Sequence, residues 1–251
     1  MSEPVPAVDV PPAGQAPSAT GPALLEFRKV CYRPSSFPGE LIEHLDLAIA
    51  AGEIVVVTGP AGCGKSTVFN LACGALRPDD GEVRLLDTEP ARLDDPALAQ
   101  VRARIGVVPQ RGALLSNLSL RDNVALPLLY HRSLPVEAAE DAVARALHDV
   151  GIANLPRIKP ADATEELRQL VALATALVLD PAVLLLDDPI AGLTGPSADG
   201  IWKRIDQTRW TRHLAVLVIS DQLPGAAIPD ARVVTLPARL QTTRSYDLDL
   251  R

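Results

Sequence analysis

The sequence predicts an α/β fold with a mostly parallel central sheet, an N-terminal antiparallel β subdomain and a helical insert subdomain. Three observations support this prediction. Short apolar runs alternate with stretches of helical spacing through most of the chain. Two segments of alternating polarity precede the first continuous apolar run, and a run of helical patterns fills the region between about 111 and 180.

The expected elements of the first part of the chain follow in order. The segments 24–31 and 41–49 alternate apolar and polar residues, as half-buried strands do. Residues 53–58 form an apolar run typical of a strand buried on both faces, and a helix is expected from about Lys65 to Ala75. The run 81–86 predicts a further strand.

The middle of the chain changes from this alternation to helices. Residues 95–104 have a helical pattern, and 105–108 read as a short buried strand that ends at a Pro-Gln pair. The segments 123–130 and 136–150 carry apolar residues three and four positions apart, as amphipathic helices do. A third helix is expected over 164–179.

The last part of the chain returns to strands. The apolar runs 183–186 and 214–219 predict two central strands, and 231–236 predicts an edge strand. Strands that alternate with helices pair in parallel and have helices on both faces of the sheet.

The stretch GPAGCGKST (59–67) follows the strand 53–58 and matches the phosphate-binding pattern G-x-x-x-x-G-K-[ST]. Its glycines allow positive φ and a close approach of the backbone to a polyphosphate, and the amino end of the next helix attracts anions. The context of strand, loop and helix predicts a P-loop NTPase. The expected nucleotide-binding residues of the loop are Gly59, Pro60, Ala61, Gly62, Cys63, Gly64, Lys65, Ser66 and Thr67.

Two side chains of this loop, and one from farther along, have specific chemistry. Lys65 can reach the β- and γ-phosphates, and the Ser66 hydroxyl can bind Mg²⁺. Asp187 ends the apolar strand 183–186, which we expect to lie beside the phosphate-loop strand and to bring this carboxylate to the Mg²⁺ ion. Cys63 has two interpretations: a small residue that fills space, or a thiol whose modification would block nucleotide binding. The sequence thus predicts a nucleoside triphosphate and Mg²⁺ as ligands.

Composition excludes some functions. A net charge of −7, a pI near 5.1 and only 3% aromatic residues argue against nucleic-acid binding, which favours basic and aromatic surfaces. No apolar run approaches the roughly 18 residues of a membrane span. Residues 1–22 contain no Lys or Arg and many prolines, so we expect a disordered tail and not a secretory signal. Three cysteines without metal-ligand spacing suit a reducing cytosol.

The order of motifs resembles the ATP-binding subunit of an ABC transporter over residues 24 to about 236. The phosphate loop is followed by VVPQ (107–110), the helical insert, VALATALVLDPAVLLLDDP (171–189) and IAGLTGP (190–196). Within the family, 111–135 and the turn at 191–193 are most similar to Mla-type ATPases, which power lipid transport with Mce proteins. Lipoprotein-release ATPases share the NVALPL stretch. The implied organisation is a tail (1–22), an ATP-binding domain (23–236) with its helical insert (about 111–180), and a C-terminal tail (237–251).

The resemblance assigns further roles. Gln110 matches the glutamine that senses Mg²⁺ and the membrane subunit, and Asp188 stands at the position of the catalytic Glu. Tyr32 is either the aromatic residue that stacks on adenine or a buried tyrosine at a strand end. The implied partners are a second ATP-binding subunit, identical or different, an integral-membrane permease and an Mce-type lipid-binding protein. The implied location is the cytoplasmic face of the membrane.

Four positions depart from the family pattern. The glycine-rich signature of the family is replaced by ATEEL (163–167). Two carboxylates would then face a γ-phosphate bound by the opposite subunit. In the alternative interpretation, Glu165 and Glu166 suit the first turn of a helix with Asp162 as its cap. Asp188 is shorter than the family's Glu by about one carbon–carbon bond, ~1.5 Å. Asp221 stands where the family has a histidine, and Thr194 replaces an aspartate. All four changes fall on the hydrolytic machinery, whereas the binding loop is intact.

Three functions follow from these observations. The first is a transport ATPase subunit whose hydrolysis is slow or assisted by a partner. The second is a subunit that binds ATP without hydrolysing it and regulates an active homologue. The third, a soluble nucleotide-dependent switch or a nucleic-acid-maintenance ATPase, lacks the expected basic surface and has no need of the NVALPL insert.

Overall fold

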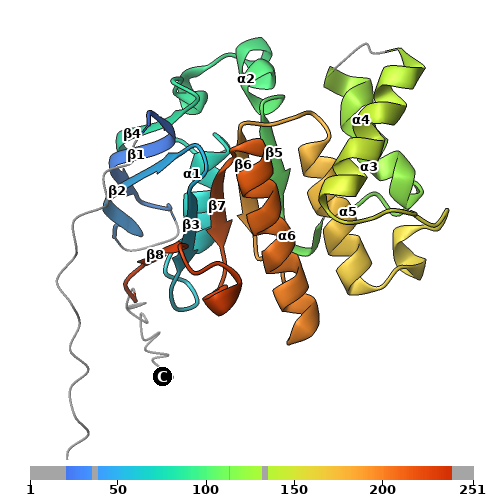
Figure 1. The fold of residues 1–251 in the computed structure, drawn as a ribbon. Helices are drawn as coiled ribbons and strands as arrows, with labels where there is room; N and C mark the ends of the chain where they lie inside the picture. The colour runs from blue at the N-terminus through green and yellow to red at the C-terminus, as the bar shows by residue number, and fades with distance from the viewer. Residues whose placement is uncertain (1–20, 36–38, 113, 132–134, 239–251) are drawn as a thin grey trace, which may run out of the picture.

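The computed structural model describes residues 21–35, 39–112, 114–131 and 135–238, and within them the chain forms two sheets surrounded by helices (Figure 1). An antiparallel sheet has the strand order β2-β1-β4, and a parallel sheet has the order β5-β6-β7-β3-β8. The predicted α/β class with an N-terminal antiparallel part is therefore confirmed. Most of the two predicted tails lies outside the described residues.

The antiparallel sheet is formed by the segments of alternating polarity. β1 (Ala23–Tyr32) pairs with β2 (Ile42–Ala50) on one side and β4 (Asp80–Leu85) on the other. Alternate residues of β1, including Leu25 and Phe27, are buried in the core that this sheet shares with the parallel sheet. Amphipathic alternation thus places one face of the sheet against the rest of the domain.

The parallel sheet is buried on both faces at its three central strands, β6, β7 and β3. Its strands are β3 (Ile54–Thr58), β5 (Ile105–Val108), β6 (Val183–Asp187), β7 (Ala215–Ile219) and β8 (Arg232–Thr235). Successive residues of β3 enter different cores, because side chains alternate across a strand: 54 and 56 pack on one side, 55 and 57 on the other. This explains why these strands read as continuous apolar runs.

The expectation that the strand of Asp187 lies beside the phosphate-loop strand is wrong. β7 lies between them, paired with β6 through Leu186–Val218 and with β3 through Val56–Val218. Strand order in a parallel sheet depends on crossover connections and not on the strands' own sequences, which is why the motif pair did not reveal the intervening strand. β8 is an edge strand, as predicted.

Helices cover both faces of the parallel sheet. α1 (Lys65–Ala72) packs between the two sheets, and α5 (Glu165–Leu177) and α6 (Pro196–Arg212) contribute to the core on the opposite face (Figure 1). α2 (Asp95–Arg102) leads into β5. α1 ends three residues earlier than expected, at Ala72, because Gly74 adopts φ +67°.

The helical insert forms a lobe beside the β5 edge of the sheet (Figure 1). α3 (Leu120–His131) and α4 (Val136–Asp149) pack on each other and on α5, which also contacts β5. α5 therefore belongs to both the lobe and the core. None of the described helices combines the length and apolar character that crossing a bilayer requires.

α6 was not predicted from the sequence. Polar and charged residues are spread around it, so it lacks the apolar stripe that marks an amphipathic helix. It buries Ile201, Trp202 and Ile205, and Pro196 at its first position starts it without losing a hydrogen bond.

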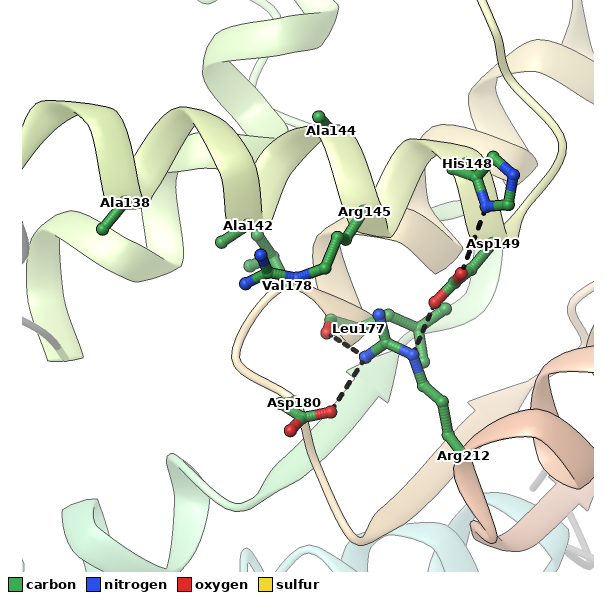
Figure 2. Close-up of a pocket in the computed structure, with 10 residues that line it drawn as sticks. All are labelled: Ala138, Ala142, Ala144, Arg145, His148, Asp149, Leu177, Val178, Asp180 and Arg212. Carbon is green, nitrogen blue, oxygen red and sulfur yellow. Dashed lines mark hydrogen bonds and ion pairs between the residues drawn. The ribbon is translucent and has the colours of Figure 1, made fainter.

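An ion-pair cluster at the end of α6 joins the lobe to the core (Figure 2). The Arg212 guanidinium lies 2.6 Å from Asp149 of α4 and 3.2 Å from Asp180, and it donates a 2.9 Å hydrogen bond to the Leu177 carbonyl of α5. These residues line a cleft of about 650 Å³ between α4, α5 and α6. Asp180 precedes β6, whereas Asp187 ends it. This cleft therefore lies at the amino ends of the parallel strands, and the phosphate loop lies at their carboxyl ends.

Candidate functional site

The phosphate loop connects β3 to α1, and its backbone has the predicted geometry. Gly59, Gly62 and Gly64 all adopt positive φ, at +147°, +79° and +103°. A Cβ atom on Gly64 would meet Ile42 Cδ1 at 2.7 Å, and one on Gly59 would meet the Leu236 carbonyl oxygen at the same distance. Glycine is therefore required at both positions by space as well as by conformation.

The amino end of α1 is suited to an anion. The helix begins at Lys65, as predicted, and Gly64 at its N-cap makes no side-chain hydrogen bond to it. The first turn of this fully described helix carries no acidic residue. Its first backbone amides and its positive dipole end thus face the loop without a side-chain competitor. Ser66 is exposed, and Thr67 is partly buried.

Cys63 is buried among the apolar residues below the loop, with 1% of its surface exposed. Its Sγ occupies the space that a Cβ on Gly59 would need, at 2.8 Å. The interpretation of Cys63 as a small residue that fills space agrees with this position. Pro60 and Ala61 are exposed at the tip of the loop.

Lys65 makes three polar contacts. Its Nζ donates hydrogen bonds to the carbonyls of Gly59, at 2.6 Å, and Pro60, at 3.0 Å. The same atom forms an ion pair with Asp221 Oδ1 at 3.0 Å. Asp221 follows β7, which pairs with the phosphate-loop strand, so the sheet brings this carboxylate to the loop. Asp221 departs visibly from the family pattern in the sequence, but its contact with Lys65 was not predicted.

Asp187 is the last residue of β6 and lies at the carboxyl ends of the parallel strands, where Asp221 and the phosphate loop also lie. Burial raises the pKa of the Asp187 carboxyl group, the charge of Asp188 raises the pKa further, and Lys65 opposes the rise. A partly buried carboxylate whose ionised form is unfavourable is a good ligand for a hard cation, since the cation replaces the lost hydration. The donor set of Asp187 and Ser66 thus suits Mg²⁺, although the strand order differs from the predicted one.

Asp188 is held in an unusual backbone conformation with φ +49°. Its amide donates to the Ile219 carbonyl at 2.7 Å, and its Oδ1 accepts a 3.3 Å hydrogen bond from Ser220 Oγ. Ser220 is a site residue that the sequence analysis missed. Its position directly after the buried strand 214–219 is the signal that could have found it, since polar residues at the carboxyl ends of parallel strands meet at one edge.

Gln110 and Tyr32 come from different sheets. Gln110 follows β5, whose Val108 pairs with Leu186 directly before Asp187, and its side chain is exposed. Tyr32 ends β1 opposite Ile42, the residue that packs against Gly64. Tyr32 is partly buried at a strand end, which fits one of its two interpretations, and its role in adenine stacking stays a prediction.

The acidic segment at the start of α5 has partners within the chain. Glu165 forms an ion pair with Arg168 and accepts a hydrogen bond from Gln169, whereas Glu166 accepts a 2.8 Å bond from Ser197 Oγ at the start of α6. Both residues occupy the first turn of α5, as predicted. Their side chains are thus anchored in the chain itself.

The proposed cap of α5 is wrong. Thr164 and not Asp162 is the N-cap, because the Leu167 amide donates to Thr164 Oγ1 at 3.3 Å. Asp162 belongs to the preceding 3₁₀ turn, and the extended backbone of Ala163 separates it from α5. Thr194 is exposed in the loop that leads to α6.

Several known proteins are similar to this chain in sequence or in structure. A family model described as ABC transporter matches residues 42–191. The chain is 30% identical to the intermembrane phospholipid transport system ATP-binding protein MlaF of Haemophilus influenzae, over 83% of this chain and 82% of that protein. It is 35% identical to the lipoprotein-releasing system ATP-binding protein LolD of Chromohalobacter salexigens, over 82% and 86%. The dimeric structure of MJ0796, a bacterial ABC transporter cassette, superposes with a TM-score of 0.73 at 26% identity and covers 85% of this chain and 94% of that chain.

Proposed function

The chain belongs to the ABC transporter family as an ATP-binding domain, and on that premise we propose that its phosphate loop binds MgATP to drive a membrane permease. The observation that carries this proposal is the loop between β3 and α1, with three glycines at positive φ and Lys65 at the start of the helix. This arrangement directs backbone amides and an ammonium group toward a polyphosphate.

In this proposal each residue of the site has a separate task. The amides of residues 59–67 and Lys65 hold the phosphates, and Ser66, Asp187 and Gln110 hold Mg²⁺. An Mg²⁺ ion held by these residues would supply positive charge against the phosphates. Asp188 orients the attacking water as the base, and Tyr32 stacks on the adenine. Ser220 fixes the Asp188 carboxylate through the 3.3 Å hydrogen bond.

We propose that hydrolysis is weak in the isolated chain. The carboxylate of Asp188 is one methylene shorter than a glutamate, and positioning of the attacking water dominates phosphoryl transfer. Asp221 adds a negative charge beside Lys65, at 3.0 Å. The same two features support the alternative function, in which the chain binds ATP but leaves hydrolysis to an active homologue. The two functions differ in whether the assembled complex hydrolyses ATP at this site.

The proposed partners follow from the surface and from the relatives. A cleft of about 330 Å³ between α2, β5, α3 and α5 is lined by residues that include Arg102, Val107 and Pro127. Leu129 and Tyr130 of α3 have 78% and 79% of their surface exposed. Because this cleft lies between the helical lobe and the core, a permease helix seated there would respond to the movement of one relative to the other.

The wider assembly is also a proposal. The names of the MlaF and LolD relatives support transport of a phospholipid or a lipoprotein. The resemblance to Mla-type ATPases supports an Mce-type lipid-binding protein as a partner and the cytoplasmic face of the membrane as the location. The dimeric MJ0796 cassette supports pairing with a second ATP-binding subunit, identical or different.

Isothermal titration calorimetry of the purified chain with MgATP tests the central proposal. The wild type is expected to bind, and Lys65→Ala is expected to lose at least about 100-fold in affinity, because a buried charge-assisted contact to phosphate is removed. Lys203→Ala, at an exposed position of α6, is the matched control and is expected to leave binding unchanged. Absence of MgATP binding in the wild type would contradict the proposal.

A further inference from the structure

Each of the three N–H donors of Lys65 can be matched to an acceptor within the described part of the chain. An ammonium group has three N–H donors. The Gly59 and Pro60 carbonyls and the Asp221 carboxylate are three acceptors within 3.0 Å of its Nζ. The Lys65 side chain is only 14% exposed, so water has little access to it. A phosphate oxygen that binds Nζ must therefore displace one of these three partners.

Asp221 is the partner that a phosphate can displace. The two carbonyls belong to the phosphate loop itself, next to Lys65 in sequence, whereas Asp221 approaches from β7. Its side chain is 72% exposed, so it can rotate toward solvent at low cost. The Asp221 carboxylate thus occupies a position on Nζ that a terminal phosphate oxygen would take, and it carries the same sign of charge.

Rotation takes the Asp221 carboxylate off Nζ but leaves the residue beside the phosphate loop, because the backbone on both sides of it is hydrogen-bonded. The Ser220 amide donates to the Val57 carbonyl of β3 at 3.1 Å, and the Gln222 amide donates to Ser220 Oγ at 3.1 Å. The same Ser220 hydroxyl donates to Asp188. A triphosphate would therefore have its last phosphate close to a carboxylate that has lost its counterion.

The negative charge of Asp221 acts mainly on the last phosphate of a nucleotide. A nucleoside triphosphate carries one phosphate more than a diphosphate, and this phosphate extends beyond the part cradled by the loop amides. Asp187 and Asp188 also end at this side of the sheet, and Asp187 has the proposed Mg²⁺ as its counterion, whereas Asp221 has only Lys65. Repulsion from Asp221 thus acts more strongly on a triphosphate than on a diphosphate.

We propose that Asp221 is a specificity-determining residue that lowers the affinity of the site for nucleoside triphosphates relative to nucleoside diphosphates. This inference rests on the proposed nucleotide binding at Lys65 and adds a preference to it. The carboxylate forms an ion pair with the lysine and would compete with the terminal phosphate of a bound nucleotide.

The test compares the Kd of the Mg²⁺ complexes of ADP and of the β,γ-imido analogue of ATP, which resists hydrolysis. Calorimetry is performed on the wild type, Asp221→Asn, Asp221→Ala and the control Asp141→Asn. Asp141 is exposed on α4, and its substitution changes the net charge by the same amount as Asp221→Asn. Both Asp221 variants are expected to gain about tenfold or more for the triphosphate relative to ADP, because a like-charge contact is removed. Asp141→Asn is expected to keep the wild-type ratio.

The outcomes separate this inference from the proposed function. If the wild type binds neither nucleotide, nucleotide binding itself is refuted. If it binds both and the two Asp221 variants keep the wild-type ratio, the preference is refuted while nucleotide binding stands. A gain in Asp221→Asn without one in Asp221→Ala also refutes the preference, because the effect would then come from the new amide donor and not from the lost charge.

Discussion

The phosphate loop and the strand ends that face it differ in how they are built. The loop is a stretch of nine consecutive residues, 59–67, that follows one strand and runs into the first turn of one helix, and its conformation depends on its own glycines. The facing residues Asp187, Asp188, Ser220 and Asp221 come from two other strands, and each depends on the sheet for its position. The residues of one loop must all be suitable for the loop to adopt its conformation, whereas residues from separate strands can be substituted one at a time. This difference explains how a chain can keep the chemistry of binding while it alters the chemistry of hydrolysis.

The largest effect is expected from a change inside the loop. Gly64→Val places a Cβ atom within 2.7 Å of Ile42 Cδ1 at a position with φ +103°. A β-branched residue cannot adopt this conformation without strain, so the loop must change shape. MgATP affinity is expected to fall by at least about 100-fold in calorimetry, since a displacement of ~1 Å can cost that much.

The matched control for this change is Gly52→Ala. Gly52 also has a positive φ, of +79°, but an added Cβ would meet nothing within 4 Å. This variant is expected to lose about 1 kcal/mol of stability from backbone strain and to bind MgATP as the wild type does. If Gly64→Val bound MgATP normally, nucleotide binding would not require glycine at this position of the loop.

The second prediction concerns the facing strand ends. Asp188→Glu lengthens the base by one methylene and is expected to raise ATP turnover in the assembled complex, by up to about 100-fold if positioning of the water is the limiting defect. Turnover is measured by phosphate release, and calorimetry checks that MgATP affinity stays within about twofold, because binding rests on the loop. Unchanged turnover would show that the shorter carboxylate does not limit hydrolysis.

The difference between the two regions also decides what the sequence could predict. The loop, the apolar strands and the acidic ends of the strands were predicted, because each depends on neighbouring residues. The position of β7 between β3 and β6 was not, and neither was the contact between Lys65 and Asp221, since both depend on how distant segments pair. The helix α6 was missed for a different reason: its packing uses a few large residues, such as Trp202, on a helix that is polar elsewhere.

The smallest expected effect is a pH dependence of the free energy of unfolding, which arises from Asp187 at the facing strand ends and not from the phosphate loop. The pKa of Asp187 in the folded protein is raised above its ordinary value of 3.8, mainly by burial. Just above that value the folded state binds more protons than the unfolded state, so the free energy of unfolding falls as pH rises through this window. At neutral pH the nucleotide-free protein carries the full penalty. Asp187→Asn is expected to remove it and to make the nucleotide-free protein more stable than the wild type at pH 7, with the difference lost near pH 3.

Chemical denaturation at several pH values, with and without Mg²⁺ and ATP, measures this effect. A bound cation relieves the unfavourable charge of Asp187 in the wild type, whereas the Asn side chain has no charge to relieve. Mg²⁺ with ATP should thus stabilise the wild type more than Asp187→Asn, although the variant is the more stable protein without ligand. Asp141→Asn, which removes an exposed carboxylate of α4, should show neither effect. If the nucleotide-free Asp187→Asn protein were the less stable of the two at pH 7, Asp187 would be a structural residue, and the facing strand ends would be stabilised without a cation.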